Sequence, residues 1–232
     1  MKILSESRQT LAERANGPKR LSRFGAQAGV PVLPKKPRFK PSQNRNPAAR
    51  LEDLAAQIRV CVKCPLCQSR TNAVPGEGKP SARFMIIGEG PGKDEDKTGH
   101  PFVGSAGRYL DHVMEGTGIE RSDFFITNIV KCRPPANRAP KAGEIETCTA
   151  NYLFEQIELI NPELILLLGL VAVKKMLGVK TVEEARGKVI EAQGRKFIAT
   201  YHPAVRFYRE DLAAKVKTDF ALFKREAKKM AR

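Results

Sequence analysis

The sequence predicts an α/β fold, a three-layer sandwich in which helices cover both faces of a central, mainly parallel, four-stranded sheet. Short apolar runs, of a length suited to strands, alternate along the chain with segments of helical periodicity. These runs lack an alternation of polar and apolar residues, which is typical of parallel strands that are buried on both faces. Helices and strands in alternating order build such a sheet when right-handed crossovers connect the strands.

The first half of the chain contains two of the expected strands. Residues 47–60 place leucine, alanine and isoleucine at helical spacing, and we expect a helix there. The run FMII at residues 84–87 predicts a strand, because such a run suits a buried, pleated surface. Residues 105–115 predict a helix that is ended by glycines. The run FFITNIV at residues 124–130 predicts the second strand.

The second half begins with the loop KCRPPANRAP, in which three prolines exclude regular structure. The apolar pattern beyond it predicts further helices and strands. In chain order we expect a helix at residues 142–160, a strand at 164–168 and a helix that ends at residue 177. A hairpin follows, in which a turn at residues 193–194 joins the region of residue 189 to residues 197–200. The last element is a helix that begins near residue 210.

Composition indicates one folded domain and a polyanionic partner. The chain has 232 residues, of which 41% are hydrophobic, and carries a formal net charge of +16. Such a positive balance favours nucleic acid as the partner. No apolar run approaches the roughly 20 residues that cross a bilayer, and the beginning of the chain lacks the apolar stretch of a secretory signal. We therefore expect a soluble, intracellular monomer that resides in the cytoplasm and associates with the nucleoid.

Residues 1–46 differ from the rest of the chain in composition. Residues 1–50 contain twelve lysines and arginines against two glutamates, and large apolar residues are few among them. Such a segment cannot bury enough surface to offset the entropy of ordering, so we expect a basic, disordered extension before a folded domain at 47–232. The spacing from Leu21 to Phe24 partly resembles a sliding-clamp-binding peptide, although its glutamine and second aromatic residue are missing.

Three polar residues follow separate predicted strands. Glu89 lies directly after the first strand, Asn128 near the end of the second, and His202 after the last. Ligands of open α/β sheets bind outside the carboxyl ends of the strands, so we expect these side chains to meet in one crevice. The loop that begins at Gly88 is rich in glycine, which lets a ligand approach the backbone closely.

The cysteines form a second group. Cys61 and Cys64 are spaced as CxxC, whereas Cys132 and Cys148 lie on either side of the proline-rich loop. Four thiolates from two segments suit a tetrahedral zinc ion or a cubane iron-sulfur cluster, and ligand type alone does not separate these two metals. A disulfide is rare inside cells. Cys67 is an additional candidate ligand that spacing does not exclude.

The motifs GEGPGKDEDKTGHPFVGSAGRYLD, TNIVKCRPPANR and YHPA, together with CVKCPL and Cys148, closely resemble those of the iron-sulfur uracil-DNA glycosylases of family four, particularly the archaeal-type members. The resemblance extends from about residue 51 to the end of the sequence. It implies the fold of these enzymes and a monofunctional hydrolase of base excision repair. Such an enzyme flips uracil out of single- or double-stranded DNA, hydrolyses the N-glycosidic bond and leaves an abasic site.

The resemblance also implies roles for individual residues. Cys61, Cys64, Cys132 and Cys148 would bind a [4Fe-4S] cluster that pins the first helix of the domain, which leaves Cys67 outside the pattern. The residues expected to contact the flipped base are Glu89, Gly90 and Pro91 beside uracil, Glu95 where it would obstruct a thymine methyl group, Phe102 stacked on the ring, Asn128 at the Watson-Crick edge, and His202 as a donor to O2. We expect His202 and Glu89 to act in catalysis.

Two departures from related enzymes qualify this interpretation. Gly90 occupies the position at which other uracil-DNA glycosylase families carry a catalytic aspartate, so the group that positions the attacking water stays open, with Glu89 and nearby main-chain groups as candidates. The sequence also lacks the arginine-rich insert with a nucleophilic histidine that covalent uracil-binding relatives carry, and we expect ordinary turnover. The alternatives are a non-catalytic iron-sulfur DNA-binding module and an electron carrier. The presence of Phe102, Asn128 and His202 argues against a pure binder.

Overall fold

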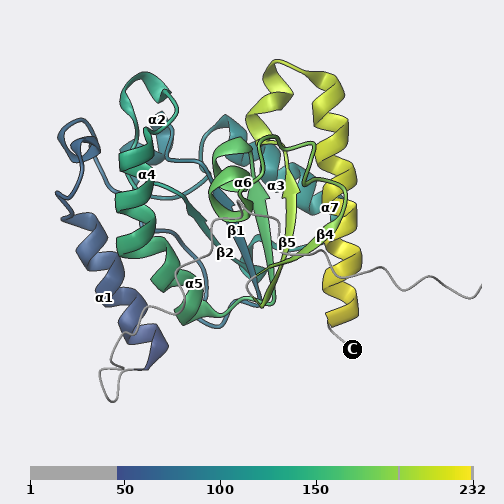
Figure 1. Cartoon of the computed structure of the whole chain (residues 1–232), viewed down its shortest axis with the longest axis horizontal. Helices are drawn as coiled ribbons and strands as arrows, with labels where there is room; N and C mark the ends of the chain where they lie inside the picture. Colours follow the sequence, from purple (N-terminus) through teal and green to yellow (C-terminus); the bar gives the residue numbers. More distant parts are fainter. Residues whose placement is uncertain (1–45, 193, 231–232) are drawn as a thin grey trace, which may run out of the picture.

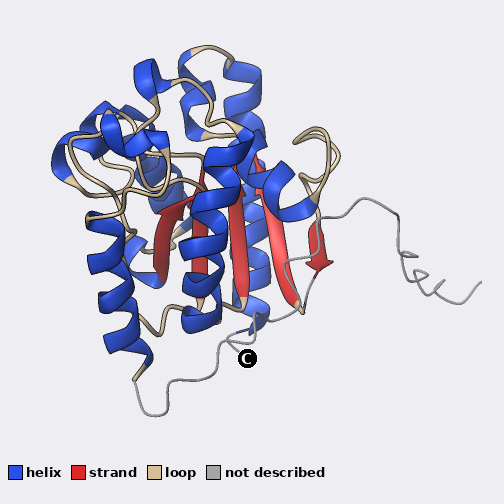
Figure 2. Cartoon of the chain, turned by 60° about the vertical axis from the view of Figure 1, so that its left-hand side comes forward, coloured by secondary structure: helices blue, strands red, loops and turns tan. Residues whose placement is uncertain are grey.

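The computed structural model describes residues 46–192 and 194–230, which form a central sheet with helices on both faces (Figures 1 and 2). No helix in these two ranges is long and apolar enough to span a membrane. Residues 1–45 of the predicted basic extension, including Leu21 and Phe24, lie outside the described residues. The three-layer α/β architecture predicted from the sequence is confirmed.

The sheet has five strands in the order β2-β1-β3-β5-β4, so the prediction of four strands was wrong by one. The first four strands of this order are parallel, and β4 pairs with β5 in the antiparallel direction. The extra strand is the first arm of the predicted hairpin, which adds itself to the edge of the sheet. The strands are β1 (Phe84–Gly88), β2 (Phe124–Asn128), β3 (Leu164–Leu168), β4 (Val189–Ala192) and β5 (Arg195–Thr200).

Alternating side chains of each strand face two separate hydrophobic cores. Met85 and Ile87 of β1 point to one face of the sheet, where α1, α5 and α6 cover them, whereas Phe84 and Ile86 point to the other face, which α3 and α7 cover. Because both faces are covered, β1, β2 and β3 are buried along their whole length, as their continuous apolar sequences predict.

Most helices begin and end close to the predicted positions. The predicted helix at residues 142–160 is continuous but contains one π-helical turn, Thr149–Leu153, directly after Cys148. The short helix α2 was not predicted, because it has few apolar residues and lies within the glycine-rich loop. The α-helices are α1 (Pro47–Arg59), α2 (Lys93–Thr98), α3 (Ser105–Thr117), α4 (Ala142–Cys148), α5 (Phe154–Ile160), α6 (Leu170–Leu177) and α7 (Glu210–Met230).

The carboxyl ends of the parallel strands lie at one edge of the sheet. Gly88 of β1 is in register with Asn128 of β2, and the pairing continues beyond the strands because the backbone N–H of Val130 donates to the carbonyl of Glu89 at 3.1 Å. Thr200 ends β5 at the same edge, in register with Leu168 of β3. This arrangement brings the loops after β1, β2 and β5 together, as expected.

Candidate functional site

A cavity of about 490 Å³ lies where the loops after β1, β2 and β5 meet. It is large enough for one base and part of a sugar, and its lining combines apolar surface with a few polar groups, as is usual for ligand pockets. All seven residues that the sequence predicts to contact a base line it: Glu89, Gly90, Pro91, Glu95, Phe102, Asn128 and His202.

The aromatic ring of Phe102 forms one wall of the cavity. The residue is 5% exposed and has a φ of 53°, which is uncommon for a side chain with a Cβ. Its place depends on two glycines. A Cβ on Gly88 would lie 2.5 Å from the ring, and a Cβ on Gly107 would lie 1.8 Å from the carbonyl oxygen of Phe102. These glycines let the first turn of α3 and the end of β1 pack directly against Phe102.

Asn128 presents an unsatisfied polar atom to the site. The residue is 2% exposed, and its Oδ1 has no hydrogen-bond partner among the described residues. A buried acceptor without a partner is rare in proteins and costs roughly 1–3 kcal/mol. The side chain lies beside Gly88, where an added Cβ would be 2.5 Å from Oδ1. Asn128 is therefore ready to bind a ligand that offers a hydrogen-bond donor.

His202 lies across the cavity from the glycine-rich loop and is held in one tautomer. Its Nδ1 accepts a hydrogen bond from the backbone N–H of Ala204 at 3.2 Å. Burial lowers the pKa of His202 to about 4, although the nearby charge of Glu95 opposes that shift. The imidazole is therefore neutral near pH 7 with its proton on Nε2, which makes Nε2 a hydrogen-bond donor.

Glu95 holds the loop around the cavity in addition to lining it. One carboxylate oxygen accepts the backbone N–H of Gly104 at 2.8 Å, and the other accepts the N–H of Gly92 at 3.0 Å. Gly92 and Gly104 precede α2 and α3, so one buried side chain fixes the starts of two helices. The sequence motif predicted Glu95 as a site residue but did not reveal this clamp.

Glu89 and Gly90 lie at the base of the glycine-rich loop. Burial raises the pKa of Glu89 above its ordinary value, because the charged form loses hydration. A Cβ on Gly90 would lie only 2.8 Å from a methyl group of Val130, which is fully buried. An aspartate at position 90 would therefore need Val130 to move, and Glu89 is the acidic residue of this turn that reaches the cavity.

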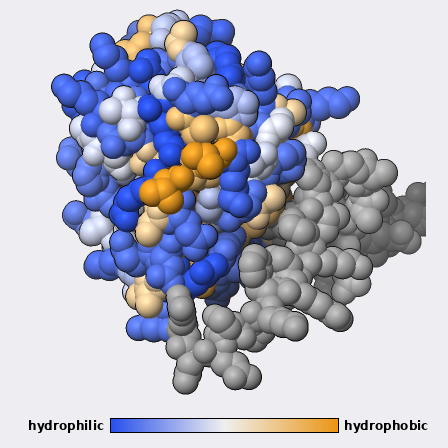
Figure 3. All heavy atoms as spheres, turned by 90° about the vertical axis from the view of Figure 1, so that its left-hand side faces the viewer, coloured by the Kyte–Doolittle hydropathy of each residue, from blue (hydrophilic) through white to orange (hydrophobic). Residues whose placement is uncertain are grey.

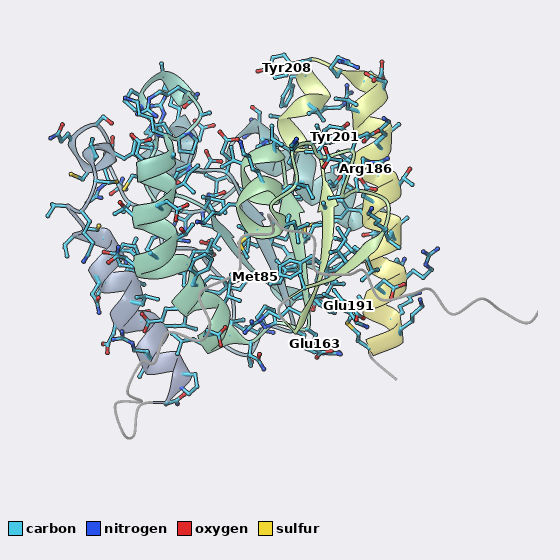
Figure 4. All side chains as sticks on the ribbon, viewed as in Figure 1. Met85, Glu163, Arg186, Glu191, Tyr201 and Tyr208 are labelled. Carbon is cyan, nitrogen blue, oxygen red and sulfur yellow. The ribbon has the colours of Figure 1, made fainter. Side chains whose placement is uncertain are left out.

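Sequence reasoning missed Tyr208 and Phe207, which lie at the end of the turn that follows His202. Tyr208 lines the cavity although it is 81% exposed, and it packs edge-on against Phe207, which is 53% exposed. Figure 4 shows Tyr208 beyond Tyr201, outside the carboxyl ends of the strands. Two adjacent aromatic residues shortly after the YHPA motif are the signal that could have identified this rim.

The cysteines line a second, smaller cavity between α1, α4 and the loop after β2. All five described cysteines face it: Cys61, Cys64, Cys67, Cys132 and Cys148. Beside this cavity the loop after α1 exposes Val60 and Val62. The face of the molecule that includes α1 is mostly hydrophilic and has one small hydrophobic patch (Figure 3).

The sulfur atoms of this cavity are placed as hydrogen-bond acceptors. The guanidinium of Arg70 donates to Sγ of Cys132 at 3.0 Å, and the backbone N–H of Lys131 donates to Sγ of Cys148 at 3.3 Å. Burial raises the pKa of Cys148 to about 11, so its thiol is protonated unless a strong positive charge binds there. Donors aimed at the sulfurs of the two buried cysteines, Cys132 and Cys148, suit ligated thiolates.

The arrangement of the side chains around this cavity can be described further. Among the described residues, no three histidine, cysteine, aspartate or glutamate side chains gather closely enough for one metal ion. Cys67 faces the same cavity from the 3₁₀ turn Pro65–Gln68, and its backbone N–H donates to the carbonyl of Cys64 at 3.2 Å.

The fold and the cavity at the strand ends define an α/β protein with a base-sized site. Comparison with known proteins shows the family to which it belongs. Residues 75–227 match the family model described as the uracil DNA glycosylase superfamily, to which the chain belongs. Within it, the chain is a member of the type-4 family. The type-4 uracil-DNA glycosylase of Archaeoglobus fulgidus is 41% identical over 179 residues, which are 73% of this chain and 89% of that protein. Those of Sulfurisphaera tokodaii and Thermotoga maritima are 43% and 44% identical, over 73% and 66% of this chain and 81% of each relative.

Proposed function

We propose that this protein is a monofunctional uracil-DNA glycosylase of DNA repair, which flips uracil out of DNA, hydrolyses its N-glycosidic bond and leaves an abasic site. The observation that carries the proposal is the unpartnered, buried Oδ1 of Asn128 in the same cavity as Phe102 and His202. A flipped uracil supplies what this atom lacks, since N3–H of uracil is a donor at the Watson-Crick edge. Membership of the type-4 family supports the same activity.

His202 stabilises the charge that develops as the bond breaks. Cleavage of the bond from N1 to C1′ leaves negative charge on uracil, part of it on O2. The neutral imidazole donates from Nε2, because its Nδ1 is occupied by the N–H of Ala204. A fixed donor strengthens as charge accumulates and therefore lowers the barrier more than it improves ground-state binding. The low pKa of His202 keeps the side chain a hydrogen-bond donor and not a cation at neutral pH.

Asn128 and Phe102 recognise the base. The amide accepts N3–H through Oδ1 and donates to O4 through Nδ2, which matches uracil and not cytosine. The ring of Phe102 covers one face of the pyrimidine. Glu95 lies in the cavity wall, where it would obstruct the 5-methyl group of thymine, and it keeps the loop closed through Gly92 and Gly104.

Glu89 positions the attacking water. It is the acidic side chain of the turn after β1, it lines the cavity, and a side chain at Gly90 is opposed by Val130. The backbone of Gly90 and Pro91 contacts the base from the same turn. Ionised Glu89 also stabilises the positive charge that develops on the sugar as uracil leaves.

Cys61, Cys64, Cys132 and Cys148 are the ligands that we assign to a [4Fe-4S] cluster. The donor set fits this group, because the sulfurs face one cavity and those of Cys132 and Cys148 receive hydrogen bonds. When bound, such a cluster supplies cross-links between segments, in the way that structural metals contribute to folding. It would tie the end of α1 to the loop after β2 and to α4, and that loop carries Pro134 into the wall of the base cavity.

The substrate is single- or double-stranded DNA, and two further regions of the chain are suited to it, residues 1–46 and the aromatic rim of the cavity. Residues 1–46 form a basic extension before the catalytic domain at 47–232, and their charge would bind phosphates. Deletion of residues 1–46 is then expected to weaken DNA binding and flatten its salt dependence, with little change in the single-turnover rate.

The exposed pair Phe207 and Tyr208 can stack on bases beside the extruded nucleotide. We expect a monomer in the cytoplasm, and a sliding clamp as partner is a further proposal.

The deciding experiment is the release of free uracil from a single-stranded oligonucleotide by the full chain and by His202→Ala. We expect the parent to turn over and the variant to be about 100-fold slower, since removal of one preorganised donor costs roughly 3 kcal/mol. Binding of uracil-containing DNA should change much less. If the parent binds DNA but releases no uracil, the chain is the non-catalytic DNA-binding module. Equal single-turnover rates for parent and variant would remove His202 from the mechanism.

A further inference from the structure

Lys131 is a buried lysine to which the mechanism above gives no role. Its side chain is among the largest that are fully buried, and the residue is 1% exposed. The ammonium group donates to the backbone carbonyl of Asn128 at 2.8 Å and to Oγ1 of Thr127 at 2.5 Å. Both acceptors belong to the last two residues of β2, and the second of them, Asn128, lines the base cavity. Lys131 therefore holds the backbone from which the amide of Asn128 projects.

The same residue forms part of the cysteine cavity. Lys131 lines that cavity, precedes Cys132 in the chain, and donates its backbone N–H to Sγ of Cys148 at 3.3 Å. Its carbonyl accepts the N–H of Val74 at 2.7 Å, so the backbone is fixed on both sides. One residue thus contacts a proposed cluster ligand through its main chain and the recognition residue Asn128 through its side chain.

The charge of Lys131 has no ordinary counter-ion. Among the residues that the structure describes, no carboxylate forms an ion pair with it, and the cavity that Lys131 lines holds the thiols of Cys132 and Cys148 and no carboxylate. A buried ammonium without an opposite charge is strongly unfavourable. Thiolates that bind a metal cluster stay ionised and so provide that opposite charge. The buried lysine and a filled cysteine cavity would therefore stabilise each other.

We propose that Lys131 is a positioning residue that couples the cysteine cavity to the base cavity: its ammonium group is kept in place by the thiolate ligands and in turn fixes Asn128 against the uracil edge. This inference rests on the proposed function, because it assigns Asn128 to base recognition. It predicts that loss of the lysine charge affects recognition of the base more than bond cleavage, and also changes the electronic properties of the cluster.

The test compares Lys131→Met, which keeps the length and removes the charge, with Lys131→Arg, which keeps the charge. The matched control is Lys175→Met, since Lys175 pairs with Glu146 of the same helix as Cys148 but contacts neither cavity. Iron content, the visible spectrum and the midpoint potential report on the cluster. The inhibition constant of free uracil, together with kcat and KM on an oligonucleotide containing uracil, reports on the base cavity.

We expect Lys131→Met to shift the midpoint potential to more negative values, because a positive charge beside the thiolates favours the reduced cluster. We also expect about tenfold weaker inhibition by uracil, because one charge-assisted hydrogen bond that positions Asn128 is lost. The KM for the oligonucleotide should rise by a larger factor than kcat falls. Lys131→Arg should recover part of both effects. An unchanged potential and an unchanged inhibition constant in Lys131→Met would overturn the proposal.

A second variant covers the case in which Lys131→Met holds no iron. Thr127→Val removes one acceptor of the ammonium group and leaves every charge in place. We expect it to keep its iron and to weaken inhibition by uracil at least threefold, and parent-like inhibition would again contradict the proposal. Failure of the proposed function is a separate result. A parent that releases no uracil from DNA removes the assigned activity, whereas the potential shift in Lys131→Met is measured independently of activity.

Discussion

The ring of Phe102 stacks on the imidazole of His202, with centroids 5.9 Å apart and ring planes inclined by 29°. The contact joins the loop after β1 to the loop after β5, which are separated by about half of the chain. Phe102 forms the wall on which a base would lie, and His202 supplies the proposed donor to O2. A displacement of Phe102 should therefore disturb both base binding and catalysis. The site can then be tested by substituting residues that pack against Phe102 but do not contact the base.

Gly107→Ala is the first such test. The new Cβ would lie 1.8 Å from the carbonyl oxygen of Phe102, so helix α3 or Phe102 has to move. We expect the single-turnover rate to fall by about 10- to 100-fold, because small displacements of positioning groups have effects of that size. Overpacking should also lower the free energy of unfolding by about 1–3 kcal/mol. Oligonucleotide cleavage and thermal unfolding measure the two effects.

Gly116→Ala is the matched control, since Gly116 lies on the same helix and an added Cβ there meets nothing within 4 Å. We expect parent-like cleavage and a stability gain of up to about 1 kcal/mol from the better helix former. A Gly107→Ala protein that behaves like Gly116→Ala would show that the place of Phe102 does not depend on this contact.

The sequence was sufficient to bring Glu89, Asn128 and His202 together, because each follows a strand and the carboxyl ends of parallel strands meet at one edge of the sheet. It was not sufficient for features that depend on packing between distant segments. The clamp made by Glu95 and the burial of Lys131 follow from loop conformations that no periodicity encodes. Strand β4 was assigned to a hairpin but not to the sheet, since its half-buried residues read as an edge and not as a core strand.

The pH dependence of the reaction should show whether ionised Glu89 positions the attacking water. Burial raises the pKa of this carboxyl above its ordinary value of 4.5, so the ionised form is lost earlier as the pH falls. If ionised Glu89 positions water, the rate should begin to decrease with falling pH at a value above 4.5. His202 should contribute only near pH 4, because burial lowers the pKa of His202 to about 4.

Single-turnover rates of the parent and Glu89→Gln between pH 4 and 8 measure this acid limb, the decrease of the rate with falling pH. Glutamine does not titrate, so we expect a slower variant with a flat profile down to about pH 5. An acid limb of equal position in both proteins would assign the titration to another group.

Glu95→Ala should destabilise the protein as well as enlarge the cavity. The substitution leaves the N–H groups of Gly92 and Gly104 without their acceptor, and the latter hydrogen bond is buried. We expect a loss of about 2–3 kcal/mol in the free energy of unfolding, as for other buried groups left unpaired. Some cleavage of uracil should remain, with new space beside C5 of the base.

Chemical denaturation of the parent, Glu95→Gln and Glu95→Ala separates the two roles of this side chain. The glutamine keeps the size of the side chain and one acceptor oxygen, so its loss of stability should be intermediate. Parent-like stability of Glu95→Ala would mean that Gly92 and Gly104 find other partners and that Glu95 is not a clamp. Cleavage of T:G mismatches by the same variants shows whether the new space admits a methyl group.

The assignment of four cysteines among five is tested by Cys148→Ser and Cys67→Ser. Cys148 is buried, receives the N–H of Lys131, and lies at the π-helical turn that joins α4 to α5, whereas Cys67 is partly exposed on the 3₁₀ turn after Cys64. We expect Cys67→Ser to keep about four iron atoms per chain, the brown colour and the parent's activity, as the four-thiolate ligation of a cubane cluster requires. Cys148→Ser should lose most of its iron and much of its solubility, because the loop after β2 is then no longer tied to α1.

Anaerobic purification followed by iron analysis and visible absorption gives the answer without an activity assay. Loss of iron in Cys67→Ser with retention in Cys148→Ser would exchange the two cysteines in the ligand set, and zinc without visible absorption in the parent would replace the cluster altogether.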